Sequence, residues 1–337
     1  MHKMLYGAAI IIGCFLSCKH PAPNYQSIAG NVEALTNAIA KDSSDAQLYY
    51  LRADFYYTHK QIDLALKDAL SAVRLDSLNA TYYVLLSDIY FAQKETDLTE
   101  ETLQKAITID KKRNDARLKL AELYYFEQMY DQCIATIDEA TKLNAYNPTG
   151  YLIKAFCYKD KRDTANYLRM LYLVKDQNPK EIKVHLELGY YYQQKKSPEA
   201  IPHYQNALII DPNNEEVHYN LGQLYYELDD IENAKEQYNI LISLDTKSIY
   251  SKNALYNMGY IAMNVDKDLN EAINYFSKAI EQDNLFAQAY QARGEAYENL
   301  QKYDEARSDY EKCLKIDINN EAALAGLNAI DKLQKNK

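Results

Sequence analysis

The chain has 337 residues and a formal net charge of −10, with 48 acidic against 38 basic side chains. This balance repels nucleic acid, and no basic stripe or Arg-rich run offsets it, so we exclude nucleic-acid binding. Hydrophobic residues make up 47% of the chain and only nine Gly and seven Pro interrupt it, which excludes a long disordered segment.

The first 17 residues have the composition of a signal peptide. Lys3 precedes a mostly apolar run, Leu5 to Leu16, which is too short to cross a bilayer as a helix because about 20 residues are needed. The segment Phe15-Leu16-Ser17-Cys18 resembles the lipobox of bacterial lipoproteins, in which the cysteine is acylated. The resemblance implies a lipid anchor, such as palmitate, at Cys18. Cys14 is a second candidate, and an ordinary secretory signal is the alternative.

Residues 18–24 contain two prolines and are predicted to form a short extended linker behind this anchor. Lys19 follows the cysteine where lipoproteins of the inner membrane have Asp. The resemblance therefore implies an outer-membrane lipoprotein that faces the periplasm of a Gram-negative cell envelope. In residues 25–45, apolar side chains recur at helical spacing from Tyr25 to Lys41, which predicts an N-terminal capping helix.

From residue 46 onward, one pattern returns about every 34 residues. In residues 182–214, apolar residues recur three and four apart on both sides of a polar break, which predicts two helices and a turn. Small residues such as Gly189 and Ala200 would let these two helices approach closely. The first helices of the copies are marked by Arg52-Ala53, Leu86-Ser87, Leu120-Ala121, Lys154-Ala155, Leu188-Gly189, Leu221-Gly222, Met258-Gly259 and Arg293-Gly294.

This pattern resembles that of tetratricopeptide repeat (TPR) proteins. The resemblance implies an all-α fold, an α-α solenoid wound as a right-handed superhelix, with eight TPR hairpins and a capping helix at each end. The hairpins are predicted at residues 46–79, 80–113, 114–147, 148–181, 182–214, 215–248, 252–286 and 287–320, and the C-terminal capping helix at 321–337.

Two hairpins depart from the pattern. In the fifth, one residue is missing, so Pro198 is predicted to begin a late second helix, whereas Pro202 removes a helical donor at a cost of about 3 kcal/mol. In the fourth, Tyr167 stands where a small residue is expected. We therefore predict a bend or looser packing between residues 160 and 205.

Cysteines and histidines give no sign of a metal site or cofactor. Cys133 and Cys313 replace the Ala of other copies and are expected to be buried small hydrophobes, and His185 and His218 should face the core. With Cys157 these cysteines are three in number and separated, which gives no disulfide framework, although a disulfide stays possible in an oxidising periplasm. A Gly-rich phosphate loop, a Gly-x-Ser-x-Gly elbow and a His-Glu-x-x-His segment are all absent, so we predict no enzyme.

The resemblance also implies a binding surface, because the first helices of TPR proteins line a concave groove. The residues carried over to this surface are Tyr50, Asp54, Tyr57, Asp88, Phe91, Glu122, Tyr125, Phe156, Tyr190, Tyr219, Gln223, Tyr226, Tyr256 and Tyr260. An acidic row in the first half and a tyrosine-rich wall in the second suit an extended peptide with basic and apolar side chains. Alternatively, the tyrosines only fill the core of a chain that contains 33 of them and no Trp.

These observations favour a non-enzymatic protein–protein interaction scaffold of the bacterial cell envelope, which binds a peptide or protein partner in the groove. The alternative is a glycan-binding lipoprotein, because tyrosine faces can stack on sugar rings. We exclude the clamp that holds the C-terminal tails of cytosolic chaperones, since its Lys, Asn and Arg are replaced here by Tyr50, Asp54 and Leu85.

Overall fold

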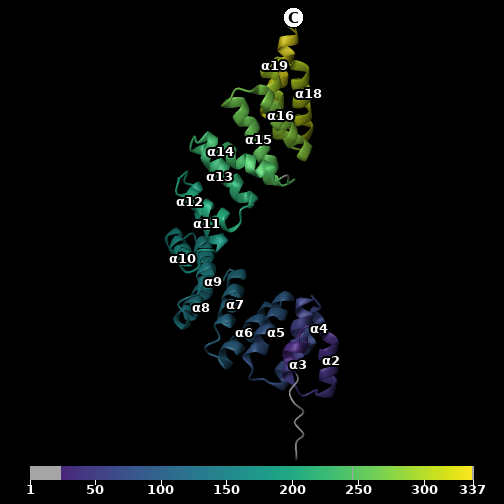
Figure 1. Ribbon diagram of the computed structural model, residues 1–337, viewed down its shortest axis with the longest axis vertical. Coiled ribbons are helices and arrows are strands. Elements are labelled where there is room, and N and C mark those ends of the chain that lie inside the picture. Colours follow the sequence, from purple (N-terminus) through teal and green to yellow (C-terminus); the bar gives the residue numbers. More distant parts are fainter. Residues whose placement is uncertain (1–23, 245, 336–337) are drawn as a thin grey trace, which may run out of the picture. The chain divides into compact units, whose positions relative to one another are not determined.

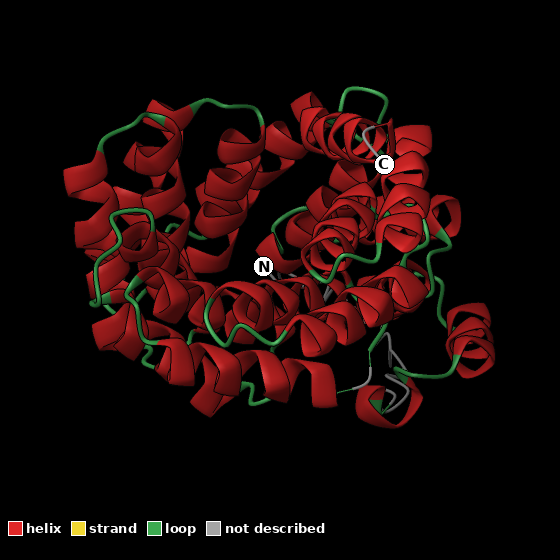
Figure 2. Cartoon of the chain, turned by 90° about the horizontal axis from the view of Figure 1, so that it is seen from above, coloured by secondary structure: helices red, strands yellow, loops and turns green. Residues whose placement is uncertain are grey.

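The computed structural model describes residues 24–244 and 246–335. Every regular element in these ranges is an α-helix, and loops join consecutive helices (Figures 1 and 2). No helix in the described ranges has the length and apolar character that a bilayer span requires. The predicted signal peptide and the lipidation at Cys18 or Cys14 lie outside the described residues.

The chain divides into two compact units, of which the first ends at Cys157 and the second begins at Tyr158. The first unit contains α1 (Tyr25–Ile28), α2 (Val32–Lys41), α3 (Ala46–Thr58), α4 (Ile62–Leu75), α5 (Ala80–Ala92), α6 (Thr96–Ile109), α7 (Asn114–Phe126), α8 (Tyr130–Leu143) and most of α9 (Pro148–Asp160). The second contains α10 (Thr164–Gln177), α11 (Ile182–Gln193), α12 (Ala200–Ile210), α13 (Glu215–Glu227), α14 (Ile231–Ser243), α15 (Ile249–Asn264), α16 (Leu269–Gln282), α17 (Ala287–Asn299), α18 (Tyr303–Ile316) and α19 (Glu321–Lys335). Within each unit, consecutive helices such as α3 and α4 or α13 and α14 pair as hairpins, and successive hairpins pack through pairs such as α4 with α5 and α14 with α15. This architecture is an α-α solenoid of TPR-type hairpins.

Backbone chemistry explains why the helices begin and end where they do. Asp45, Asn79 and Asn214 each precede a first helix and accept a hydrogen bond from a backbone N–H of its first turn. The turn between the two helices of a hairpin contains a residue with positive φ. In seven of the eight hairpins the next N–H donates to the carbonyl five residues earlier, as in a Schellman-type cap. The residues with positive φ are Lys60, Lys94, Gln128, Arg162, Lys196, Asp229, Lys267 and Gln301, one in each hairpin.

The structure differs from the predicted helices in three places. The N-terminal segment forms two helices instead of one, because Asn31 caps α2 by accepting from the N–H of Ala34. Helix α15 begins at Ile249, three residues before the predicted hairpin. Helix α12 begins at Ala200, so Pro198 precedes the helix instead of opening it.

The predicted cost of Pro202 is wrong for the same reason. Pro202 is the third residue of α12, and the first four N–H groups of a helix have no intrahelical acceptor, so no donor is lost there. Tyr167 is accommodated in the core: it is buried on α10, and its hydroxyl donates to Glu187 Oε2 at 2.5 Å. The bend between residues 160 and 205 stays a prediction.

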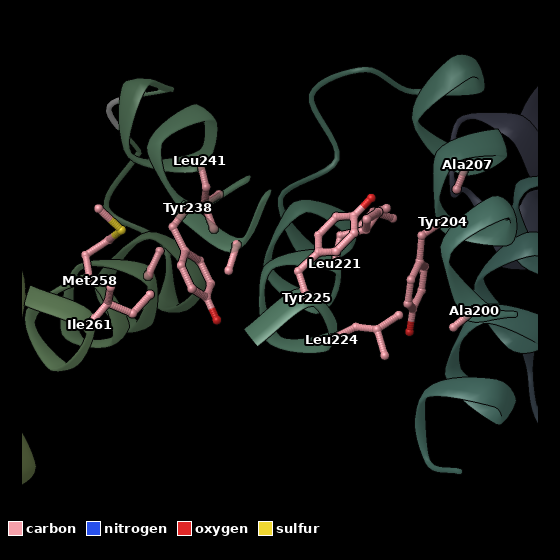
Figure 3. Packing of buried hydrophobic residues seen from close by; sticks show 13 residues of the cluster. Ala200, Tyr204, Ala207, Leu221, Leu224, Tyr225, Tyr238, Leu241, Met258 and Ile261 are labelled. Carbon is pink, nitrogen blue, oxygen red and sulfur yellow. The ribbon is translucent and has the colours of Figure 1, made fainter. Parts of the chain in front are cut away.

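Size matching between the two helices of a hairpin organises the core. In the second unit, Gly189, Gly222, Gly259 and Gly294 lie against the rings of Tyr204, Tyr238, Phe276 and Tyr310, and a Cβ atom at these glycines would lie 2.5 to 2.8 Å from a ring carbon. Figure 3 shows the rings of Tyr204 and Tyr238 extending from their helices into this core. In the first three hairpins the same two positions hold Ala53, Ser87 and Ala121, and Ala69, Leu103 and Ile137. Glycine therefore occurs where the facing residue is aromatic.

This match predicts the effect of one added methyl group. Gly222→Ala should destabilise the second unit by about 1 to 3 kcal/mol, because the new Cβ would overlap the ring of Tyr238. Urea unfolding followed by circular dichroism measures this loss. Adding Tyr238→Ile recreates the Ala121 and Ile137 combination and should recover part of the stability. A double variant no more stable than Gly222→Ala would contradict the size match.

Cysteine and histidine positions agree with their predicted burial. Cys133 and Cys313 are fully buried, and His185 and His218 are nearly so. The Nε2 atom of His185 lies 2.9 Å from the carbonyl oxygen of Pro179, and that of His218 lies 3.0 Å from the carbonyl oxygen of Pro212. Both imidazoles thus hydrogen-bond the loop that precedes their helix.

Two arginine–aspartate pairs whose aspartates are buried join neighbouring helices in the described part of the chain, and they were not predicted from the sequence. Arg52 forms a two-bonded pair with Asp68, and Arg293 forms the same pair with Asp309. Each arginine also donates from Nη1 to a hydroxyl of the helix that precedes its hairpin, Thr36 on α2 for Arg52 and Ser277 on α16 for Arg293. One guanidinium therefore connects three helices in the first and in the eighth hairpin.

Candidate partner-binding surface

The fourteen predicted partner-binding residues lie on the first helices α3, α5, α7, α9, α11, α13 and α15. None of them is buried, and Phe91, Tyr190 and Tyr226 are 43%, 52% and 43% exposed. First helices of adjacent hairpins contact one another, α3 with α5 and α13 with α15. The predicted residues are thus accessible on the first helices of each unit, and their binding role stays a prediction.

In the first unit, this face carries what we call the acidic surface: Tyr50, Asp54, Tyr57, Asp88 and Glu122. The pKa of Asp54 is raised, first by partial burial and then by the charge of Asp88. Burial and the neighbouring carboxylates also raise the pKa values of Tyr50 and Tyr57. Each added negative charge on this surface is unfavourable, so a cationic group would be stabilised there.

Lys119 on α7 neutralises one carboxylate of the acidic row, and this lysine was not among the predicted residues. Its Nζ atom lies 2.6 Å from Asp88 Oδ1, so one of the three carboxylates already has a counter-ion. A cavity of about 50 Å³ lies beside this pair and is lined in part by Phe91 and Glu122. The acidic row is therefore two carboxylates, Asp54 and Glu122, on either side of an ion pair.

Aromatic side chains extend the acidic surface along α5, α7 and α9. The ring of Phe91 meets that of Phe126 edge-on, with centroids 5.7 Å apart, and the centroids of Tyr125 and Phe156 are 6.4 Å apart. Phe126 is 65% exposed and was not among the predicted residues. Apolar area thus lies next to the carboxylates.

In the second unit, the first helices carry what we call the tyrosine surface: Tyr190, Tyr219, Gln223, Tyr226 and Tyr260. A cavity of about 250 Å³ opens on it and is lined by Gln223, Tyr226, Glu227, Tyr238, Asn257 and Tyr260. Asn257 Nδ2 donates to the hydroxyl of Tyr238 at 3.0 Å, and Gln223 Nε2 donates to the hydroxyl of Tyr219 at 3.0 Å. We call the cavity of about 250 Å³ the Tyr226 cavity.

A second cavity of about 280 Å³ is lined by Lys159, Leu186, Glu187, Tyr190, Tyr204, Glu216 and Asn220. Tyr204 and Tyr238 are core residues of α12 and α14, yet each reaches a cavity of the tyrosine surface. The glycines opposite their rings leave room for this reach. Tyr204 and Tyr238 were not among the predicted residues, and neither were Asn220 and Asn257. Both asparagines lie two residues before the marker glycines of their helices.

Amide and hydroxyl groups beside exposed aromatic rings can bind an extended polypeptide. Amides can donate to and accept from a peptide backbone, and tyrosine rings supply contact area with little loss of conformational entropy. Tyr256 is less available, because its ring packs 5.1 Å from that of Phe286 and 5.8 Å from that of Phe276. It contributes mainly to packing between α15 and its neighbours.

Comparison with known families agrees with this architecture. Models described as tetratricopeptide repeat match residues 32–80, 80–113, 215–248 and 287–320, and a model described as TPR repeat matches residues 190–229. Together these matches cover just over half of the chain. The chain belongs to the tetratricopeptide repeat family. Proteins of this kind serve as scaffolds for protein–protein interaction, and TPR repeats are not themselves catalytic units.

Similar proteins share the repeat and differ in length. This TPR protein is 26% identical over 199 residues to the DnaJ homolog subfamily C member 7 homolog of Dictyostelium discoideum, covering 55% of this chain and 36% of that protein. It is 27% identical over 134 residues to the human mitochondrial import receptor subunit TOM70, covering 39% of this chain and 22% of that protein. The chain thus matches about a third or less of either relative.

Among solved structures, pilF of Pseudomonas aeruginosa is similar, with a TM-score of 0.52 and 16% identity. The match covers 64% of this chain and 97% of pilF. At this identity the likeness supports the fold alone.

Proposed function

We propose that this TPR protein is a non-enzymatic scaffold of the bacterial cell envelope that binds an extended segment of another envelope protein. The Tyr226 cavity carries the proposal, because it places the exposed Tyr226 and the half-buried Tyr260 beside amide groups of the first helices. The partner is a peptide or protein. Nucleic acid, metal and cofactor have no part in the proposal, and the membrane is contacted through the lipid anchor at Cys18 alone.

Charge indicates the chemistry of the partner segment. Within residues 24–244 and 246–335, Asp54 and Glu122 have no ion-pair partner of the kind that Lys119 gives Asp88, and burial raises the pKa of Asp54. A Lys or Arg side chain of the partner would stabilise the ionised carboxylates. Apolar side chains would lie against Phe91 and Phe126 on the first unit or beside Tyr226 on the second.

Capture from solubilised envelopes tests the binding. The wild-type chain should retain a partner that the double variant Tyr226→Ala with Asp88→Lys retains about tenfold less, because one change removes an aromatic contact and the other reverses a charge. Tyr146→Ala with Glu281→Lys is the matched control, since both residues are exposed and lie off this face. Equal capture by both double variants would contradict the proposal.

Metabolic labelling with a fatty-acid analogue tests the anchor. Cys18→Ala should abolish the label and release the chain from the membrane fraction, because a chain without acyl groups loses about 0.8 kcal/mol of membrane affinity per buried methylene. Cys14→Ala is the matched variant and should keep both the label and the membrane association. Loss of label from Cys14→Ala alone would place the anchor at the other cysteine.

Glycan binding is the second candidate, and the exposure of Tyr190 and Tyr226 favours it. A sugar ring needs an open aromatic face, and half-buried Tyr256 offers less of one. Glycan-array binding that is lost in Tyr226→Ala and kept in Tyr146→Ala would support this candidate over a protein partner.

A further inference from the structure

Two cysteines from adjacent hairpins meet inside the first unit. Cys133 lies on α8 and Cys157 on α9, and both are fully buried. Their Sγ atoms are 3.1 Å apart, and the thiol of Cys157 donates to the sulfur of Cys133. The two residues are 24 apart in sequence, so this contact joins the third hairpin to the fourth.

Both cysteines are exceptions at their places in the repeat. The place of Cys133 is held by Ala65, Ala234 and Ala306 in other hairpins. The place of Cys157 is held mostly by larger apolar residues, namely Phe55, Ile89, Leu123, Leu224 and Ile261. At this junction a larger residue replaces Ala and a smaller one replaces Leu or Ile, so that two sulfur atoms fill the contact.

We propose that Cys133 and Cys157 form a disulfide bond when the chain folds in the presence of a thiol–disulfide oxidant. The S–H bonds of both residues break, one S–S bond forms, and the two protons end on the two sulfur atoms of the reduced oxidant. Two electrons pass to the oxidant, a small or protein disulfide, whose own S–S bond is reduced to two thiols. The sulfur atoms must approach from 3.1 Å to about 2.05 Å, a shift that small side-chain rotations can supply.

Burial determines when the bond forms. The hydrogen bond with Cys157 and then burial raise the pKa of Cys133, and the nearby carboxylate of Glu122 acts in the same direction while Lys154 opposes it. Thiolate, the reactive form, is therefore rare in the folded chain. The oxidant reaches these thiols during folding or local opening of α8 and α9, and once formed the bond is shielded from reductants.

The bond would hold part of the candidate surface in place. Phe156 adjoins Cys157 on α9, and its ring centroid lies 6.4 Å from that of Tyr125 on α7. Tying α9 to α8 fixes the spacing of these two aromatic side chains. The inference concerns the chain itself and holds whether or not a partner binds there.

Refolding of the full chain in a glutathione redox buffer tests the proposal. After refolding, thiols are alkylated under denaturing conditions and the peptides are analysed by mass spectrometry. We expect a linked peptide containing Cys133 and Cys157 in most chains, with Cys313 alkylated. Alkylated Cys133 and Cys157, glutathione adducts on them, or a bond to Cys313 would each overturn the proposal.

Two variants and a second measurement complete the experiment. Cys313→Ala should leave the yield of the linked peptide unchanged, and Cys157→Ala should leave Cys133 alkylated. Amide exchange that proceeds through opening of α8 and α9 should be slower on the order of 100-fold in the oxidised than in the reduced chain, because the bond closes a loop of 23 intervening residues. Equal exchange in both forms would show that the bond does not hold this junction.

Discussion

Replacing Asp309 with Ala is expected to destabilise the eighth hairpin by about 3 to 5 kcal/mol. The Arg293–Asp309 pair lies largely inside the protein, with side chains 19% and 8% exposed, and its two hydrogen bonds are 2.7 and 2.8 Å long. Without the carboxylate, the guanidinium stays charged in a place where little water reaches it. Urea unfolding and amide exchange in α17 and α18 measure the loss.

Other hairpins of the same chain supply the control. At the two places of Arg293 and Asp309, the second hairpin has Leu86 and Thr102, and the third has Leu120 and Thr136. The double variant Arg293→Leu with Asp309→Thr removes both charges together and should lie within about 1 kcal/mol of the wild type. If single and double variants were equally destabilised, an isolated buried charge would not be the cause.

The 34-residue period predicted the helices well because each helix must bury one apolar side against its neighbours. Residues such as Leu188, Leu221 and Ala234 are buried as the pattern requires. The N-terminal break was missed because it depends on local capping by Asn31, which the apolar spacing of Tyr25 to Lys41 does not show. Pro202 was misjudged because its effect depends on where α12 begins.

Contacts between hairpins were harder to predict than the helices. The first-helix face was found from position in the repeat, but Lys119 pairs with Asp88 across 31 residues and Cys157 meets Cys133 across 24. Neither spacing equals the 34-residue period, because each of these contacts joins different places in neighbouring copies of the repeat. The core tyrosines that reach the cavities were missed because a period predicts that a residue is buried, whereas the glycine opposite decides how far its ring extends.

Burial of His203 predicts that acid weakens the second unit. His203 on α12 is 8% exposed, its ring is stacked on Tyr192 at 5.8 Å, and its Nδ1 has no hydrogen-bond partner in the described part of the chain. Burial first, and then the charges of Lys175 and His185, lower its pKa from 6.5 to about 4. The folded chain thus holds this imidazole neutral where the unfolded chain would protonate it.

The sign of the effect follows from where the proton binds. Between pH 6.5 and about 4 the unfolded state binds a proton that the folded state does not, so stability falls as the pH falls through this window. A pKa difference of this size corresponds to about 3 kcal/mol. Urea midpoints measured between about pH 7 and about pH 4.5 should therefore decrease steeply.

The variant His203→Gln is the control. It places at residue 203 the glutamine that the sixth hairpin has at Gln237, and it should flatten the dependence of the urea midpoint on pH. An unchanged slope in that variant would assign the acid sensitivity to other groups, because glutamine has no proton to bind in this range.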